Sequence, residues 1–255
     1  VFSFTMFTSS TTATSTFSGV SLSTGGTLHM NGNLTVTGGS FSASPRPKVA
    51  GTYSGPGSFS AVAPKDPPQP DQAGGQAAAQ AAGNHFRFNG SAWERGNPPV
   101  AFTGAPGVTV SVSPPQLTFS SIFSGATYVQ GGDVRYTGST HNRTGFLMTD
   151  GAVTVTGSPQ NDASFTYSFI SLSSSATAID FPAGSQSPQG FIFWAPSGTI
   201  RATNQSGSLH GSLVAKNINV SGGSWSIENL PGAPQAAAIP FLVASTTPAI
   251  FRLTE

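Results

Sequence analysis

Five short stretches of the chain share one pattern of apolar and polar positions. In each, apolar residues occupy alternate positions, a Gly or Asn corner follows, and a second alternating run comes after the corner, in residues 28–38, 128–138, 146–157, 191–201 and 213–222. Alternation with a period of two predicts β-strands, and Gly or Asn between two strands supplies the backbone conformation of a sharp bend. Repeated strand–corner–strand units are typical of the coils of a solenoid.

A β-hairpin would also place Gly and Asn between alternating runs, so the pattern leaves a β-sandwich or jelly roll open as alternatives. The strands are short, and apolar and Thr, Ser or Asn positions recur at the same place relative to the corner, as stacked coils require. We therefore predict an all-β protein with an irregular right-handed parallel β-solenoid. Seven apolar residues should point into it: Leu34, Val36, Val134, Val153, Val155, Ile218 and Val220.

We expect the chain to be a single domain. The alternating pattern is dense in some parts of it and absent from others, which divides it into four segments. Residues 1–44 form the first coils, residues 101–228 the main coils, and residues 229–255 a closing segment with one or two apolar strands. Residues 45–100 interrupt the pattern as a loop rich in Pro, Ala, Gln and Gly, because proline cannot donate to a ladder and alanine packs poorly on a pleat. Its Ala/Gln run favours a short helix, acting as a lid or strap over the coils, or else a disordered surface loop.

The composition limits which partners the protein can bind and indicates where it is located. Only 7% of the 255 residues are charged and the net charge is +1, so strong binding to nucleic acid is disfavoured and any such contact should be weak. There is no cysteine, which removes disulfides and thiolate chemistry. The Thr/Ser-rich, charge-poor composition predicts an exported, extracellular protein, with the signal and the anchor absent from this chain and no segment long enough to span a membrane.

The residues that carry chemistry are sparse. No two of the nine carboxylates lie within four residues of each other, and the four histidines are isolated. Asp133 and Asp150 each adjoin a corner, where stacking could bring them together as an acid and base pair, although Asp beside Gly is ordinary turn chemistry. Without a nucleophile motif, a phosphate-binding loop or a metal spacing, we predict a protein that is not an enzyme and holds no cofactor and no metal.

Ligand contact is therefore the expected role of the exposed aromatic and cationic residues. Trp93 lies in a polar loop and is the first candidate. The others are Tyr136, Arg135, Arg143, Arg201 and Lys216, all within or beside the repeat units.

Across residues 18–44 and 120–226, about half of the chain, the repeat style resembles the extracellular solenoid region of large minor pilins and accessory proteins of bacterial type IV pili. The PilX-like group and the competence-associated minor pilins are the members it is similar to. The resemblance rests on residues 26–38, 127–138, 149–157 and 209–220.

The resemblance implies a non-enzymatic, cell-surface part of a pilus that acts in adhesion, assembly or DNA uptake. Its partners would be other pilin subunits, with surface polysaccharide as a further candidate. The hydrophobic N-terminal pilin helix is absent from this sequence. Two alternatives stay open: a polysaccharide-binding or polysaccharide-cleaving β-helix protein, and a structural fibre or surface-layer module.

Overall fold

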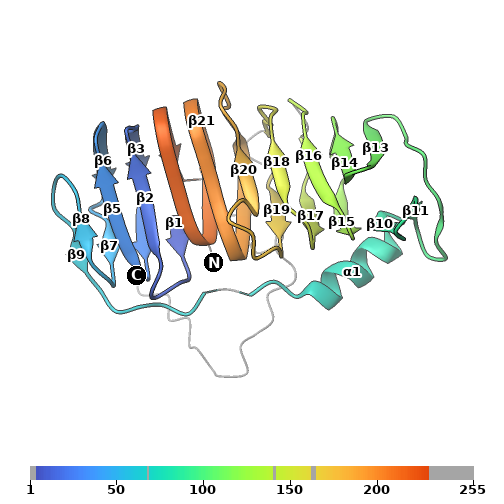
Figure 1. The fold of residues 1–255 in the computed structure, drawn as a ribbon, viewed down its shortest axis with the longest axis horizontal. Helices are drawn as coiled ribbons and strands as arrows, with labels where there is room; N and C mark the ends of the chain where they lie inside the picture. The colour runs from blue at the N-terminus through green and yellow to red at the C-terminus, as the bar shows by residue number, and fades with distance from the viewer. Residues whose placement is uncertain (1–3, 68, 140–141, 162–164, 230–255) are drawn as a thin grey trace.

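The computed structural model describes residues 4–67, 69–139, 142–161 and 165–229. It confirms the all-β prediction: parallel coils stack into a β-solenoid of about 9 turns (Figure 1). The first strands are β1 (Phe4–Thr8), β2 (Thr14–Ser18), β3 (Ser21–Gly25), β4 (Thr27–Met30), β5 (Asn33–Thr37), β6 (Ser40–Ser44), β7 (Lys48–Val49), β8 (Tyr53–Ser54) and β9 (Ser60–Ala61). Helix α1 (Gln72–Ala81) follows them.

The remaining strands lie after the helix. They are β10 (His85–Phe88), β11 (Trp93–Arg95), β12 (Val100–Ala101), β13 (Val108–Val112), β14 (Pro115–Phe119), β15 (Gly125–Gln130), β16 (Asp133–Tyr136), β17 (Gly145–Thr149), β18 (Val153–Val155), β19 (Tyr167–Ser171), β20 (Ile179–Phe181) and β21 (Gln189–Glu228). Strand β21 is 40 residues long because it bends round successive corners without losing its ladder.

Parallel pairing arranges the strands in three faces. Face A runs β10–β15–β17–β19, then through residues 191–194 and 213–215 of β21, and on to β1–β4–β7–β9. Face B runs β14–β16–β18–β20, then through two segments of β21 to β2–β5–β8. Face C ends with residues 224–228 followed by β3 and β6.

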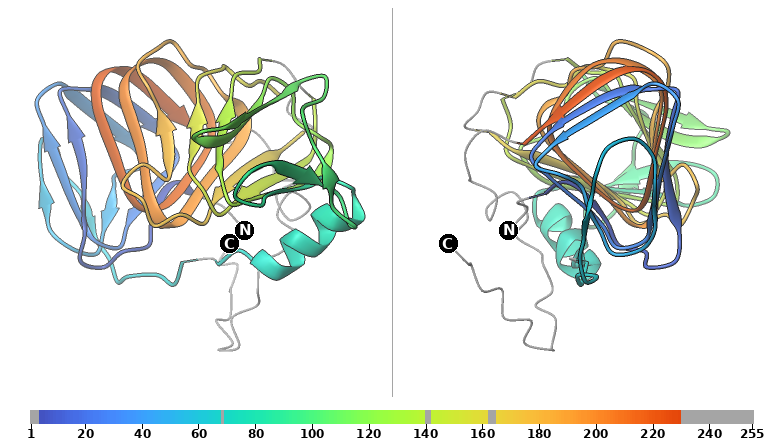
Figure 2. Two further views of the ribbon diagram at one scale, coloured as in Figure 1. Left: turned by 45° about the vertical axis from the view of Figure 1, so that its right-hand side comes forward. Right: turned by 90° about the vertical axis from the view of Figure 1, so that its left-hand side faces the viewer.

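The order of coils in space differs from their order in the chain. The chain enters at the middle of the stack with β1, builds outward to β9, and returns along the outside through residues 62–67 and 69–71 to α1 at the opposite end (Figures 1 and 2). The later strands then build back toward the middle, where β21 pairs with β1, β2 and β3. Near this seam the Thr5 hydroxyl donates to Asn229 Oδ1 at 3.0 Å.

The core fills the inside of the stack. All seven side chains predicted to point inward are buried, with exposed fractions between 0% and 4%. This confirms the inward positions that the alternating pattern predicted. Aromatic rings from neighbouring coils stack along the axis: Phe169 lies 5.7 Å from Phe191 and 5.6 Å from Phe193, centroid to centroid. Stacking like residues on like gives each coil the same interior cross-section.

Face A is apolar on its outer side as well, and α1 covers one end of it. Gly75 allows a close approach, because a Cβ there would lie 3.0 Å from the Met148 methyl group. Asp71 caps the helix by accepting a hydrogen bond from the Gly74 N–H at 2.9 Å, and Gln72 donates to the Tyr128 hydroxyl at 2.8 Å. The Ala/Gln run is therefore a helix packed on the coils, as the helix interpretation predicted, and the disordered loop is wrong for it.

The proline-rich stretch does not end the ladder where the sequence suggested. Strands β7, β8 and β9 still pair in parallel with the coils before them, because each is only two residues long and fits between prolines. At the helix end, antiparallel pairs β10–β11–β12 and β13–β14 cover the core. The expected closing strands within residues 230–255 lie outside the described residues.

Candidate functional site

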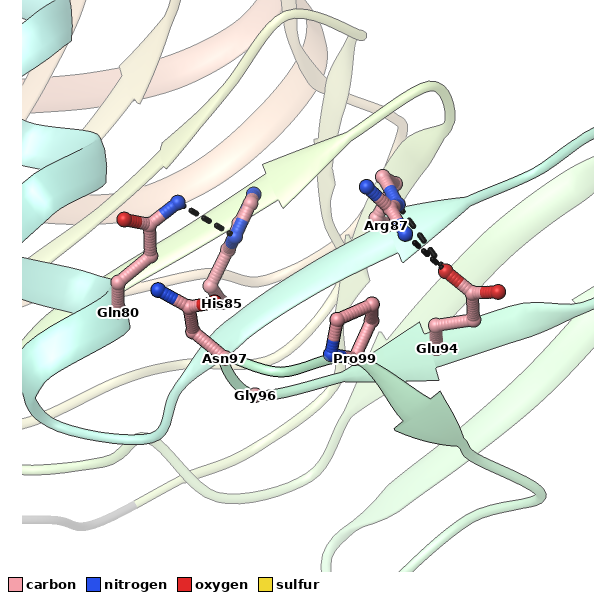
Figure 3. A pocket seen from close by; sticks show the side chains of 7 residues that line it. All are labelled: Gln80, His85, Arg87, Glu94, Gly96, Asn97 and Pro99. Carbon is pink, nitrogen blue, oxygen red and sulfur yellow. Dashed lines mark hydrogen bonds and ion pairs between the residues drawn. The ribbon is translucent and has the colours of Figure 1, made fainter.

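A small cavity lies where α1 meets β10 and β11. Gln80, His85, Arg87, Glu94, Gly96, Asn97 and Pro99 line it (Figure 3). Its volume of about 50 Å³ is far below the roughly 300 Å³ of ordinary ligand pockets, so it has room for water but not for a sugar or nucleotide.

Arg87 and Glu94, which line this cavity, bond to each other, and Asn89 beside it bonds to Glu94. Arg87 donates to Glu94 Oε2 from Nε at 3.0 Å, and Asn89 donates to Glu94 Oε1 at 2.9 Å. The hydrogen bond from Arg87 is the main cause that lowers the pKa of Glu94. Burial lowers the pKa of His85, whose Nδ1 lies 3.4 Å from Gln80 Nε2. A neutral His85 and an ionised, paired Glu94 make this cluster a link between helix and strands.

Two of the predicted contact residues point into the protein, so those predictions are wrong. Trp93 has 1% of its surface exposed, and its indole N–H donates to the Ser111 carbonyl at 2.8 Å. Tyr136 is fully buried, and its ring lies 5.1 Å from that of Phe169. Both sit on strands, at positions whose neighbours face solvent, so the pleat turns them inward.

The four predicted cations are exposed but do not form one stripe. Arg135 and Arg201 share face B, separated there by the strands β18 and β20. Arg201 is already paired, since Nε and Nη2 donate to the two oxygens of Asp180 at 2.8 and 2.9 Å. Arg143 and Lys216 lie outside the strand register that Arg135 and Arg201 share, and Arg143 donates to the Ser124 hydroxyl at 3.3 Å.

Stacking does bring Asp133 and Asp150 to adjacent coils, and both serve as turn residues. Asp133 Oδ1 accepts the Ala152 N–H at 2.8 Å, and Asp150 Oδ1 accepts the Gly131 N–H at 2.8 Å. Burial raises the pKa of Asp150, and the charge of Asp133 adds to this. Each carboxylate thus satisfies a backbone donor of the neighbouring coil, which is the turn role weighed from the sequence.

The described residues contain no group of three His, Asp or Glu side chains able to hold a metal ion. No helix in the described ranges is long and apolar enough to cross a membrane.

A regular polar surface that the sequence predictions above do not include lies on faces B and C. On faces B and C, the outward side chains of β2, β3, β5, β6 and the end of β21 are almost all Ser, Thr or Asn. We call this the hydroxyl surface, and strand register places its residues in rows along the solenoid axis: Asn219, Thr16 and Thr35; Ser221, Ser18 and Thr37; Ser224, Ser21 and Ser40; Ser226, Ser23 and Ser42.

Glycines join the two halves of the hydroxyl surface. Between faces B and C the chain turns at Gly19, Gly38–Gly39 and Gly222–Gly223, all but the first being Gly pairs with positive φ. At Gly39, with φ of 66°, a Cβ would lie 2.2 Å from the Val20 carbonyl oxygen, so a side chain is excluded there. The sequence did carry a signal for this surface: Ser or Thr recurs two residues apart, beside each Gly corner.

These features define a class: a three-faced parallel β-solenoid with one capped end, a helix on its apolar face and a polar, charge-poor outer surface. No protein-family model matches the chain, and no curated protein matches it in sequence. Among solved structures, the chain is similar to the crystal structure of the competence-associated pilin ComZ from Thermus thermophilus, with a TM-score of 0.52 and 12% identity. The likeness covers 94% of this chain and 73% of that one, and at this identity it shows the fold.

Proposed function

We propose that this solenoid is a non-catalytic, extracellular, pilus-associated domain that presents its outer faces for binding. The observation that carries the proposal is the structural likeness to a competence-associated pilin over 94% of the chain, which agrees with the minor-pilin resemblance of the repeat units. Other pilin subunits are the partners that this assignment implies.

Surface chemistry supports binding as the activity. The predicted candidates for chemistry, Asp133 and Asp150, accept backbone hydrogen bonds, and Arg87 and Glu94 in the small cavity are paired with each other. The outer faces offer hydroxyl and amide groups in ladders, an arrangement that can recognise a surface without reacting with it. Adhesion is therefore the role we favour among adhesion, assembly and DNA uptake.

Pilus association can be tested directly in the native host. Tagged protein is followed in pili sheared from the cells, and a strain lacking the major pilin serves as the control. We expect the tag in the sheared fraction and its loss from that fraction in the control strain. Tag that stays with the cell body in both strains contradicts the proposal.

A further inference from the structure

The hydroxyl surface repeats the same kind of side chain in rows, and its chemistry selects the kind of ligand that it can bind. Successive residues of a row lie one strand spacing apart, about 4.8 Å, and neighbouring rows on one face lie two residues apart along the strand, about twice the ~3.3 Å rise. The outward residues Ser21, Ser23, Ser40, Ser42 and Ser224 are exposed. Between the two faces the chain turns at Gly19, Gly38–Gly39 and Gly222–Gly223, which carry no side chains.

The four rows of the hydroxyl surface differ in charge from the helix-side half of face B. The rows of the hydroxyl surface contain no charged residue, whereas the helix-side half of face B carries Asp133, Arg135, Asp180 and Arg201. A polyanion needs clustered cations, so a nucleic acid finds no counter-charge on these rows. Protein interfaces are enriched in aromatic residues, Met and Arg, and the rows have none of these.

Once polyanions and typical protein surfaces are excluded, a neutral partner rich in hydroxyl groups matches the hydroxyl surface. Each Ser or Thr hydroxyl both donates and accepts, so it can pair with a sugar hydroxyl in either direction. One such contact is weak, and useful affinity requires many contacts made together by a partner that is itself extended and repetitive. We propose that the hydroxyl surface binds a neutral polysaccharide without carboxylate or sulfate groups. This inference rests on the proposed surface-exposed binding function and names its ligand class.

Adsorption of the purified chain to insoluble polysaccharides provides the test. Microcrystalline cellulose and chitin are the neutral probes, and insoluble calcium alginate is the acidic comparison. We expect saturable adsorption to at least one neutral probe, at least tenfold weaker adsorption to alginate, and less than a twofold change in 1 M salt. A strong loss with salt would mean that cations carry the contact and would overturn the proposal.

Variants locate the contact. The double variant Thr16→Arg/Ser23→Arg places a bulky side chain on each face of the hydroxyl surface and should weaken adsorption at least tenfold. The control, Thr118→Arg/Thr154→Arg, also introduces two arginines, at outward positions on the helix-side half of face B, and should adsorb like the unmodified chain. Circular dichroism and the Tm of each variant establish that it is folded.

A second variant, which adds no bulk, tests the same surface in case Thr16→Arg/Ser23→Arg does not fold. Ser21→Ala/Ser23→Ala/Ser40→Ala/Ser42→Ala removes hydroxyls without adding bulk, and it should also lose adsorption. Unchanged adsorption in a folded serine-to-alanine variant, or no adsorption of the unmodified chain to either neutral probe, overturns the proposal. Adsorption to ice crystals alone would assign the array to ordered water and overturn it as well. Co-sedimentation of Thr16→Arg/Ser23→Arg with sheared pili reports separately on the proposed function.

Discussion

Replacing Phe169 by Ala tests whether the aromatic ladder holds the coils together. Phe169 is fully buried, and four rings surround it with centroids 5.1 Å (Tyr136), 5.6 Å (Tyr167), 5.7 Å (Phe191) and 5.6 Å (Phe193) away. Truncating a buried Phe to Ala costs about 3–5 kcal/mol, and lost ring pairs add to the transfer and cavity terms. Since domains of this kind are stable by roughly 5–15 kcal/mol, we expect the loss of a large fraction of the free energy of unfolding.

Guanidinium unfolding followed by circular dichroism measures the loss. Phe169→Leu is the matched control, since it keeps most of the volume, and we expect about 1.5 kcal/mol or less for it. Phe59→Ala removes a ring that is 38% exposed and should cost about 1 kcal/mol or less. A loss below about 1 kcal/mol for Phe169→Ala, with an unchanged m value, would refute the claim that neighbouring coils pack through this ladder.

Three further predictions concern the Gly39 corner, the Asp150 carboxylate and DNA. Gly39→Ala should lower stability by about 2 kcal/mol or more, measured as a fall in Tm, because φ is 66° and the Val20 carbonyl oxygen occupies the Cβ position. Burial raises the folded-state pKa of Asp150 above its ordinary value of 3.8. The contribution of Asp150 to stability is therefore present below pH 3.8 and is lost as the pH rises through the folded-state pKa. Asp150→Asn should flatten this part of the pH–stability curve. Duplex DNA should bind no tighter than roughly 10⁻⁴ to 10⁻⁶ M, and Arg135→Gln should change the affinity less than threefold in a fluorescence titration. Nanomolar binding with a steep salt dependence would contradict the last prediction.

Alternation within each repeat was enough to predict the core. Val134 and Val153 could be assigned to the interior because a strand sends every second side chain to the same side. The same rule placed Tyr136 inward, since it lies two residues after Val134 and Arg135 lies between them. The residue type of Tyr136 favours an exposed contact, but its position in the strand decides its orientation.

Trp93 shows a different reason why an orientation could not be predicted from the sequence. Its strand β11 has three residues and pairs antiparallel with β10 and β12, so no repeat pattern marks its inward side. The tertiary contact with Ser111, across 18 residues, decides the orientation. Asp180 and Arg201 illustrate the same point, because only the coil length brings residues 21 apart into register on one face.

The seam at the middle of the stack explains why sequence repeats could not reveal the order of the coils. A parallel coil pairs equally well with any coil of matching cross-section, so local patterns do not say which neighbour it has. Here the first coil pairs with the last part of β21 on all three faces, and hydrogen bonds join residues 203 apart: Ile218 N–H donates to the Ser15 hydroxyl and Thr16 N–H to Asn219 Oδ1, both at 3.1 Å. Contacts at such separation cost much loop entropy before they form, so we expect the seam to close late in folding. Because Thr16 and Asn219 also begin one row of the hydroxyl surface, that surface is complete only when the seam has closed.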